Sequence, residues 1–419
     1  MKQVIILSLL LFSTKAFSQD LIKGLGLQYA DSKTLAKQNF LVPPRSFQGP
    51  VVRKKVDLSE NFPPILSQGD IGSCASWATV YAMRSYIEKK QLGYPYLSFD
   101  GMLDQNTVFS PLFIFNQVKE GGLRCDSVGS QIGKNLDKMK EMGVCKMGTF
   151  NPVPYKYPCC EVSPLDNNMA VTEATGYRIK DFGWVIRYGT FYGSGYKLAA
   201  LKNFLLKNYP IVLGIDLDSS FYKTGGQLEN GTYVWRRSDN NYVGSHAVVC
   251  VGFNDTIGAI QIYNSWGTGW ANKGMGYIAY NLLDSKVQEG YVVNPGPDVV
   301  TVSGSSVISF GSPPNDSVDQ KDFTTNLMDK NFFITNRYQP YNNIRIMPVD
   351  INASQQFVVF KIYEVKESIP YEIDVFVLRP NETYTFENSG VNYDFTLRQI
   401  KRWNGPFSKH AAYYNLKAN

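Results

Sequence analysis

The sequence predicts an α+β fold, with helices in the first half, strands in the second and an additional all-β module at the C-terminal end. Apolar residues recur at helical spacing between residues 74 and 207, and short apolar runs typical of buried strands dominate after about residue 210. A stretch rich in Gly, Pro and Ser at 291–315 then precedes a second set of strand patterns. Because the chain has 419 residues, we expect more than one domain.

The first residues have the features of a signal peptide. Lys2 supplies a positive start, residues 4–12 are apolar, and small residues around Ala16 and Ser18 suit cleavage after residue 18. We therefore expect export to the periplasm, the cell surface or the medium. The apolar run is too short to cross a membrane and no later stretch is long enough, so no transmembrane segment is expected. Residues 19–55 are polar, either as an arm packed on the next domain or as a short pro-segment removed on activation.

Composition is that of a globular protein, with 44% hydrophobic and 19% charged residues. The net charge of +6 is spread along the chain, with small basic clusters only at 53–55 and 236–237. Such clusters are typical of solvated faces, so no nucleic-acid partner is expected.

Cys74 stands at the start of the first predicted helix, after an extended run that contains Gln68 and two glycines. The apolar residues that follow share one helical face: Trp77, Val80, Met83 and Ile87. Either Ser73 caps this helix or the turn at 70–72 closes its start. A thiol at a helix N-terminus is stabilised as the nucleophilic thiolate. The alternative is a small apolar core residue.

Helices are expected at 74–90, 109–118, 132–142 and 197–207. Ser110 and Pro111 open the second of them, and Gly143 ends the third. Strands are expected at 211–215, 244–253, 258–263 and 276–280. Residues 177–188 are expected to be extended, and residues 145–170 to form a loop that contains Pro and Cys. This order favours helices on one side and a sheet on the other.

Two polar residues in the strand-rich half are candidates to act with Cys74. His246 opens an apolar strand, and the chain has only one other histidine, His410, in the polar tail. Asn264 ends the next strand, where its amide can orient the imidazole, and Trp266 follows two residues later to cover that bond. The alternative for His246 is a core histidine with satisfied hydrogen bonds.

Six cysteines limit the disulfides and metal sites that the chain can form. Cys250 lies in an apolar run and is expected to be a buried free thiol. The others beside Cys74 fall in a short interval and are candidates for one or two bridges whose pairing stays open: Cys125, Cys145, Cys159 and Cys160. No Cys/His grouping has zinc spacing, so neither a metal nor another cofactor is expected.

The motifs around Cys74, His246 and Asn264 resemble those of the papain-like cysteine peptidases over residues 56–290, with a bacterial exported type the best match. The sequence departs from the family at Ile71, where well-known members carry a bridging cysteine, and at Ala75, where they carry an aromatic residue. The gaps from the cysteine to the histidine and asparagine are also longer than usual, which points to insertions near 145–170 and 216–243.

The resemblance implies a two-lobed fold and a Cys-His-Asn triad that cuts peptides or proteins as an endopeptidase. Cys74 would be the nucleophile, His246 the acid–base and Asn264 its orienting partner. The Gln68 side chain and the Cys74 N–H would hold the oxyanion. Residues 129–130 would pair with substrate backbone.

The resemblance also implies that Gly129, Ser130 and Trp266 bind substrate. Two other functions stay open: a catalytically inactive peptide-binding protein, and an exopeptidase or acyl transferase. Residues 316–419 are expected to form a β module that binds an unknown partner or buttresses the peptidase.

Overall fold

The computed structural model describes residues 24–41, 53–121, 125, 127–156, 158–188, 196–222, 228–229, 232–296, 299 and 301–302, and in the C-terminal part 323–326, 344–352, 357–366, 369–388, 391–402 and 410–418. The signal peptide expected at 1–18 lies outside these residues, as does most of the linker expected at 291–315 beyond residue 302.

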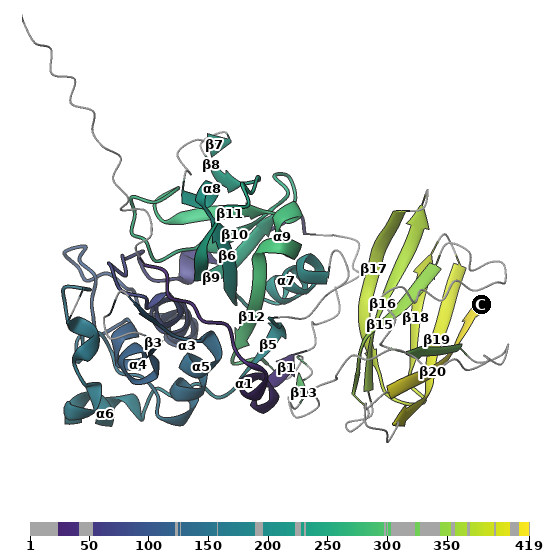
Figure 1. The fold of residues 1–419 in the computed structure, drawn as a ribbon, viewed down its shortest axis with the longest axis horizontal. Helices are drawn as coiled ribbons and strands as arrows, with labels where there is room; N and C mark the ends of the chain where they lie inside the picture. The colour runs from purple at the N-terminus through teal and green to yellow at the C-terminus, as the bar shows by residue number, and fades with distance from the viewer. Residues whose placement is uncertain are drawn as a thin grey trace, which may run out of the picture.

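The helices α3, α4, α5 and α6 gather on one side of the region before residue 303, and a large sheet with α7, α8 and α9 against it forms the other (Figure 1). The helices are α1 Ser32–Lys37, α2 Cys74–Ser76, α3 Ser85–Leu92, α4 Pro111–Val118, α5 Ile132–Glu141, α6 Asn168–Ala174, α7 Tyr196–Leu206, α8 Ser219–Tyr222 and α9 Tyr280–Lys286. Short 3-10 turns occur at Ser59–Asn61, Cys159–Glu161 and Pro164–Asp166. The expected helices are present, and α6 begins at Asn168, inside the range 145–170 that the sequence predicts as a loop.

The helix that begins at Cys74 is continuous to Leu92, but its middle, Trp77–Arg84, is π-helical. It is buried on all sides from Cys74 to Tyr86, rather than on the single face that the spacing predicts. Ser73 holds the N-cap position, yet its side chain makes no capping hydrogen bond. By contrast, the Ser110 hydroxyl accepts a hydrogen bond from the Phe113 N–H at 3.3 Å, as the sequence predicts for α4.

The sheet has the strand order β13-β1-β5-β12-β6-β9-β10-β11-β8-β7, with β2 added to β9. Its strands are β1 Asn39–Leu41, β2 Lys55–Asp57, β5 Phe182–Ile186, β6 Ile211–Asp218, β7 Leu228–Glu229, β8 Thr232–Trp235, β9 Tyr242–Asn254, β10 Ala259–Tyr263, β11 Met275–Ala279, β12 Val287–Val293 and β13 Thr301–Val302. A separate two-stranded ribbon joins β3 Glu120–Gly121 to β4 Val128–Gly129. The long strand β9 is fully buried from Ser245 to Phe253, and the helix that carries Cys74 packs against it.

Residues beyond the expected 56–290 region also belong to this sheet. The strand β12 continues to Val293, and β13 pairs with β1, which comes from the N-terminal arm. The strand β1 also runs parallel to β5. The sheet therefore extends to residue 302, past the end expected at residue 290.

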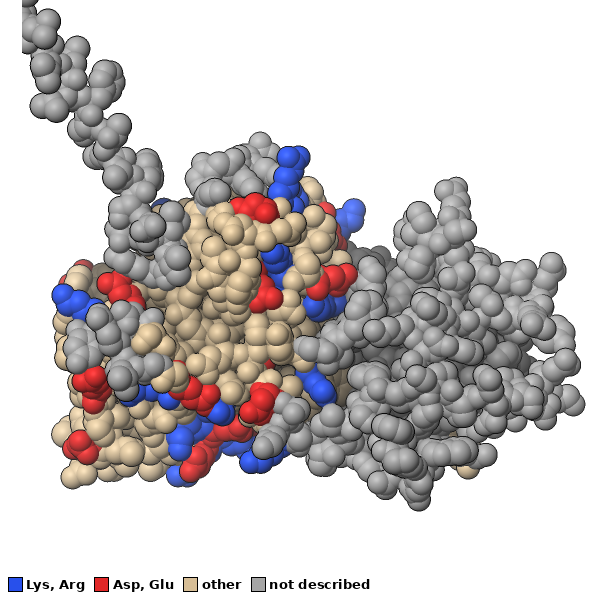
Figure 2. All heavy atoms as spheres, in the orientation of Figure 1, with Lys and Arg blue, Asp and Glu red and all other residues tan. Residues whose placement is uncertain are grey.

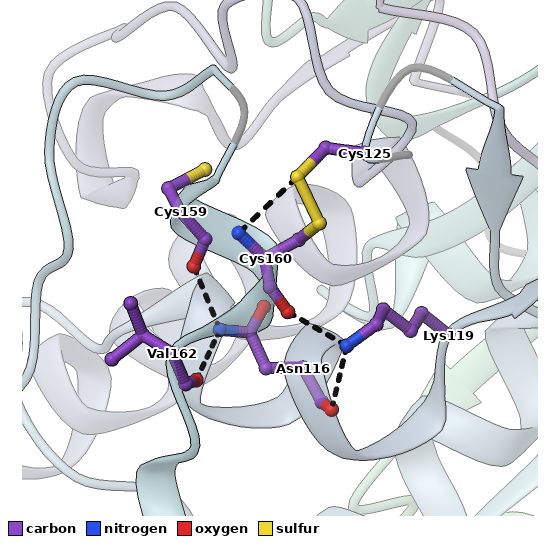
Figure 3. The surroundings of a disulfide bond; sticks show 6 residues. All are labelled: Asn116, Lys119, Cys125, Cys159, Cys160 and Val162. Atoms are coloured by element: carbon purple, nitrogen blue, oxygen red, sulfur yellow. Dashed lines mark hydrogen bonds between the residues drawn. A yellow bond between two sulfur atoms is a disulfide. The ribbon is translucent and has the colours of Figure 1, made fainter. Parts of the chain in front are cut away.

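A disulfide joins Cys125 to Cys160, while Cys74, Cys145, Cys159 and Cys250 are buried free thiols. The expectation for Cys250 agrees with the structure, and the open pairing resolves to one bridge. Figure 3 shows how α4 supports the bridged loop: the Asn116 amide donates to the carbonyls of Cys159 and Val162, and the Lys119 ammonium donates to the carbonyl of Cys160.

The described C-terminal residues form two antiparallel sheets. One contains β15 Ile344–Asn352, β16 Phe357–Lys366 and β17 Ile369–Leu378, and the other contains β14 Phe323–Asn326, β18 Thr383–Asn388, β19 Val391–Arg402 and β20 His410–Ala418. The buried rings of Phe360 and Phe395, one from each sheet, meet edge to face with centroids 4.7 Å apart. Two facing sheets with apolar contacts between them form a β-sandwich.

On the face drawn in Figure 2, the described Lys and Arg side chains alternate with Asp and Glu and do not gather into one basic patch. None of the described helices is long and apolar enough to cross a bilayer.

Candidate active site

Cys74 begins its helix beside the strand that carries His246. Its side chain is completely buried, and the backbone of Ala247, the residue after His246, lies close enough to lower the pKa of the thiol. The strand β9 and the helix therefore bring residues 74 and 246 into one region, although 171 positions separate Cys74 from residue 246 in the chain.

His246 is held by the side chain of Asn264. Its Nε2 lies 2.7 Å from the Asn264 Oδ1, and both residues are buried. The same oxygen accepts a hydrogen bond from the Ser265 N–H at 2.8 Å, which fixes the amide orientation. Asn264 can take this position because it immediately follows β10, which pairs with β9. The other ring nitrogen, Nδ1, has no hydrogen-bond partner of ordinary geometry among the described residues.

Trp266 lies against the imidazole, with ring centroids 4.6 Å apart. The Trp266 ring also stacks on that of Tyr222, with centroids 5.0 Å apart, and makes edge-to-face contacts with Phe221 and Trp270. This aromatic cluster excludes water from the histidine–asparagine contact, because large rings fill the space around it.

Gln68 also lies in this region and is completely buried. Its Nε2 donates to the carbonyl of Gly24 at 2.7 Å and to that of Ile71 at 2.9 Å, and its Oε1 accepts from the Ser265 hydroxyl at 2.6 Å. The side-chain oxygen is thus held in place, and the amide donor points at a backbone carbonyl from a distant segment.

That segment, residues 24–30, is called the covering segment below. It is extended and forms a parallel bridge between Leu27 and Ser130. Ser130 donates its N–H to the Gly26 carbonyl at 2.9 Å and accepts from the Gln28 N–H at 3.1 Å. Residues 129–130 therefore provide a backbone edge that holds an extended peptide.

At Gly26 the covering segment lies in close backbone contact with Gly72, just before Cys74, and with Gly129. A Cβ on Gly26 would lie 2.1 Å from the carbonyl oxygen of Gly72, and a Cβ on Gly129 would lie 2.0 Å from that of Gly26. Only glycine fits at these two positions without a shift of the main chain. The backbone of Gly26 also lies close enough to Cys74 to lower the pKa of the thiol.

Burial beneath this segment favours the uncharged forms of the cysteine and the histidine. Burial raises the pKa of the Cys74 thiol to about 11, against hydrogen bonds from the backbone of Ala247 and other groups that lower it. Burial likewise lowers the pKa of His246 to about 4, against the hydrogen bond with Asn264 that raises it. Burial beneath the covering segment therefore works against the thiolate–imidazolium pair that sequence reasoning expects.

Sequence reasoning did not place the covering segment or the acidic residues near it. The segment has little local pattern, and its alternation of glycine with leucine from Gly24 to Leu27 was the available signal. Glu289 was missed too, although it is the one acidic residue of the apolar strand β12. Among the residues that the structure describes, no three His, Cys, Asp or Glu side chains gather as metal ligands.

The comparisons with known proteins agree with the geometry. A family model described as the papain family cysteine protease matches residues 52–292, more than half of the chain. A peptidase C1-like protein from Acanthamoeba polyphaga mimivirus, itself uncharacterized, is 27% identical over 235 residues, which cover 55% of this chain and 69% of that protein.

Among solved structures, the chain is similar to xylellain, a cysteine protease from Xylella fastidiosa. The identity is 23%, the match covers 66% of this chain and 97% of that chain, and the TM-score is 0.50. At this identity the likeness concerns the fold alone. The cysteine protease and lectin-like domains of a surface layer associated protein of Clostridium difficile match 93% of this chain and 84% of theirs, at 14% identity and a TM-score of 0.41.

Proposed function

The chain belongs to the papain family of cysteine proteases, and on that premise we propose that it is an endopeptidase whose catalytic triad is Cys74, His246 and Asn264. The observation that carries the proposal is the 2.7 Å contact of His246 with Asn264, beside a buried cysteine at a helix start. A core histidine would not need an asparagine partner, an aromatic cover and a neighbouring thiol at once.

The reaction follows from the roles of these side chains. The Cys74 thiolate, formed by proton transfer to His246, attacks the peptide carbonyl. The imidazolium then protonates the leaving amine, and water hydrolyses the resulting thioester. The Gln68 amide and the Cys74 N–H would donate to the oxyanion, and such donors contribute about 3–4 kcal/mol where they have been measured. The contact of Gln68 with the Gly24 carbonyl supports this role, because a carbonyl oxygen already accepts from that donor.

The covering segment stands where substrate would bind, so it must leave before catalysis. Of the two interpretations of residues 19–55, this favours a pro-segment over an inert arm. Its backbone contacts with Ser130 indicate how an extended peptide or protein substrate would be held once the segment has left. We place the peptidase region at 56–302 and the β module, whose partner is unknown, after it. Export to the periplasm, the cell surface or the medium rests on the signal-peptide features of residues 1–18.

The test is hydrolysis of a fluorogenic peptide library by the full chain, with and without Gly26→Leu to displace the covering segment. Cys74→Ala should fold and lose all turnover, while Cys250→Ala, which also removes a buried free thiol, should retain it. Turnover by Cys74→Ala would identify another nucleophile. Tight peptide binding without turnover by the unmutated site would instead support the inactive peptide-binding protein, and release of single terminal residues would support an exopeptidase.

A further inference from the structure

A buried carboxylate under the covering segment has no role in the triad. Glu289 lies on β12 opposite Gly214 of β6 and is completely buried. Its Oε1 accepts a hydrogen bond from the Ala30 N–H at 2.7 Å, and its Oε2 has no partner among the described residues. Burial raises its pKa to about 8. A buried carboxylate with an unmet oxygen is costly, so its presence calls for an explanation.

The side chains of Leu27 and Tyr29, from the covering segment, pack against the backbone of Gly214 beside Glu289. A Cβ on Gly214 would lie 2.9 Å from Leu27, 3.1 Å from Tyr29 and 3.3 Å from the Cβ of Glu289. The absence of a side chain at Gly214 therefore makes the space that Leu27 and Tyr29 fill. Leu27 directly follows Gly26, whose backbone lies close to the Cys74 thiol, so this space adjoins the reacting centre.

A second carboxylate, that of Asp216, lies on β6, the strand that carries Gly214. Asp216 is two residues from Gly214, so its side chain projects from the same face of β6. It accepts hydrogen bonds from the Tyr29 hydroxyl at 2.6 Å and from the Ser245 hydroxyl at 2.9 Å. Lys197 lies close enough to Asp216 for their charges to interact, but its ammonium donates to the carbonyls of Asp284 and Val287. Neither Asp216 nor Glu289 forms a direct ion pair among the described residues.

When the covering segment leaves, both carboxylates lose their donors from it. Glu289 loses the Ala30 N–H and Asp216 loses the Tyr29 hydroxyl. An apolar substrate side chain would fill the space, but both Glu289 oxygens would then lack donors, and Asp216 would keep only the Ser245 hydroxyl among its described donors. A guanidinium or ammonium group supplies several donors and the opposite charge, and a guanidinium can meet a carboxylate with two parallel hydrogen bonds.

We propose that Gly214, Asp216 and Glu289 form a subsite that selects a cationic side chain, Arg or Lys, next to the scissile bond. The inference rests on the proposed endopeptidase and names the class of substrate it prefers. In the described form Leu27 and Tyr29 fill the subsite without matching its charge. If Glu289 served only to hold the covering segment, the one oxygen that accepts from the Ala30 N–H would be enough.

The test compares peptides that differ only by Arg, Lys, Gln or Leu at each position around the cut. The full chain with Gly26→Leu should prefer Arg or Lys over Leu in kcat/KM at one position. Glu289→Gln should lower kcat/KM for the cationic peptide at least about tenfold and leave that for the Leu peptide within twofold. Glu141→Gln, which changes an exposed glutamate on α5, is the matched control.

Two outcomes would overturn the inference while leaving the peptidase intact: a preference for Leu at every position, or an equal loss for both peptides in Glu289→Gln. If Glu289→Gln does not fold, Asp216→Asn and competitive inhibition of the unmutated subsite by argininamide against leucinamide decide instead. Stronger inhibition by leucinamide, or an Asp216→Asn variant with unchanged selectivity, would contradict the subsite. Failure to cut any peptide would contradict the proposed function, and the inference with it.

Discussion

At the scale of single residues, burial opposes charge on both the cysteine and the histidine of the described site. The Cys74 thiol and the His246 imidazole both have pKa values that favour the neutral form at pH 7. The positive end of a helix favours the thiolate, but complete exclusion of water outweighs it here, since both groups are fully buried. Exposure to water would relieve the cause of both shifts, so we expect the ion pair to form when the covering segment leaves.

Gln68 gives a prediction at this scale. Gln68→Ala in the Gly26→Leu chain should lower kcat about a hundredfold or more, because an oxyanion donor acts in the transition state. Gln117→Ala is the control, since the Gln117 amide donates only within α4, to the Phe113 carbonyl. Steady-state kinetics on one good peptide measure both. A Gln68→Ala enzyme that keeps more than a third of kcat would show that the oxyanion is held elsewhere.

At the scale of elements, the covering segment and the two central strands decide what reaches the site. The segment is held by backbone pairing with Ser130, by the Gln68 amide and by the glycine contacts at Gly26 and Gly72. Leu27 and Tyr29 add side-chain contacts, but the backbone contacts all depend on the close approach of the main chain at Gly26. One substitution that adds a side chain at the closest backbone approach should therefore dislodge it.

Gly26→Leu is that substitution, because its Cβ would lie 2.1 Å from the Gly72 carbonyl oxygen. We expect the full chain with Gly26→Leu to hydrolyse peptides at least about tenfold faster than the unmutated full chain before any processing. The control is Gly176→Leu, where an added Cβ meets only one atom, at 3.5 Å. Equal initial rates for the unmutated chain and Gly26→Leu would mean that residues 24–30 do not limit substrate access to Cys74.

Which elements could be predicted from sequence depends on whether their signal is local. The helix α4 was predictable because Ser110 and Pro111 encode its start, and α5 because Gly143 follows it. His246 was singled out because the chain has only two histidines. The π-helical stretch Trp77–Arg84 was not predictable, since its apolar pattern also suits an ordinary helix.

Contacts between distant residues left no such signal. The covering segment is positioned by backbone hydrogen bonds to Ser130 and by the Gln68 side chain. The composition of residues 24–30 does not predict either contact. The single bridge between Cys125 and Cys160 likewise depends on how the loop after α5 folds back, so four neighbouring cysteines were compatible with several pairings.

At the scale of the whole molecule, the same buried groups link stability to pH. Glu289 has its pKa raised from 4.5 to about 8, so the stability tied to its protonated form is present below pH 4.5 and lost as pH rises through about 8. His246 has its pKa lowered from 6.5 to about 4, so its contribution is present above pH 6.5 and lost as pH falls through about 4.

Glu289→Gln separates the two effects in the full chain. Between pH 5 and 8 the free energy of unfolding of the unmutated chain should fall relative to Glu289→Gln, by up to about 1.4 kcal/mol per pH unit. Denaturant unfolding at pH 5, 6.5 and 8 measures the difference, with Glu141→Gln as the exposed control. Parallel curves for the unmutated chain and Glu289→Gln would show that Glu289 carries no buried proton.

The most direct test of the central claim, that Cys74 is the nucleophile activated by His246, is to map the adduct of a thiol-directed irreversible peptide inhibitor by mass spectrometry. In the reduced Gly26→Leu chain at pH 7, the adduct should form on Cys74 and not on Cys145, Cys159 or Cys250. His246→Ala should slow it by at least about tenfold. An adduct on another cysteine, or an unchanged rate on Cys74 without His246, would contradict the account.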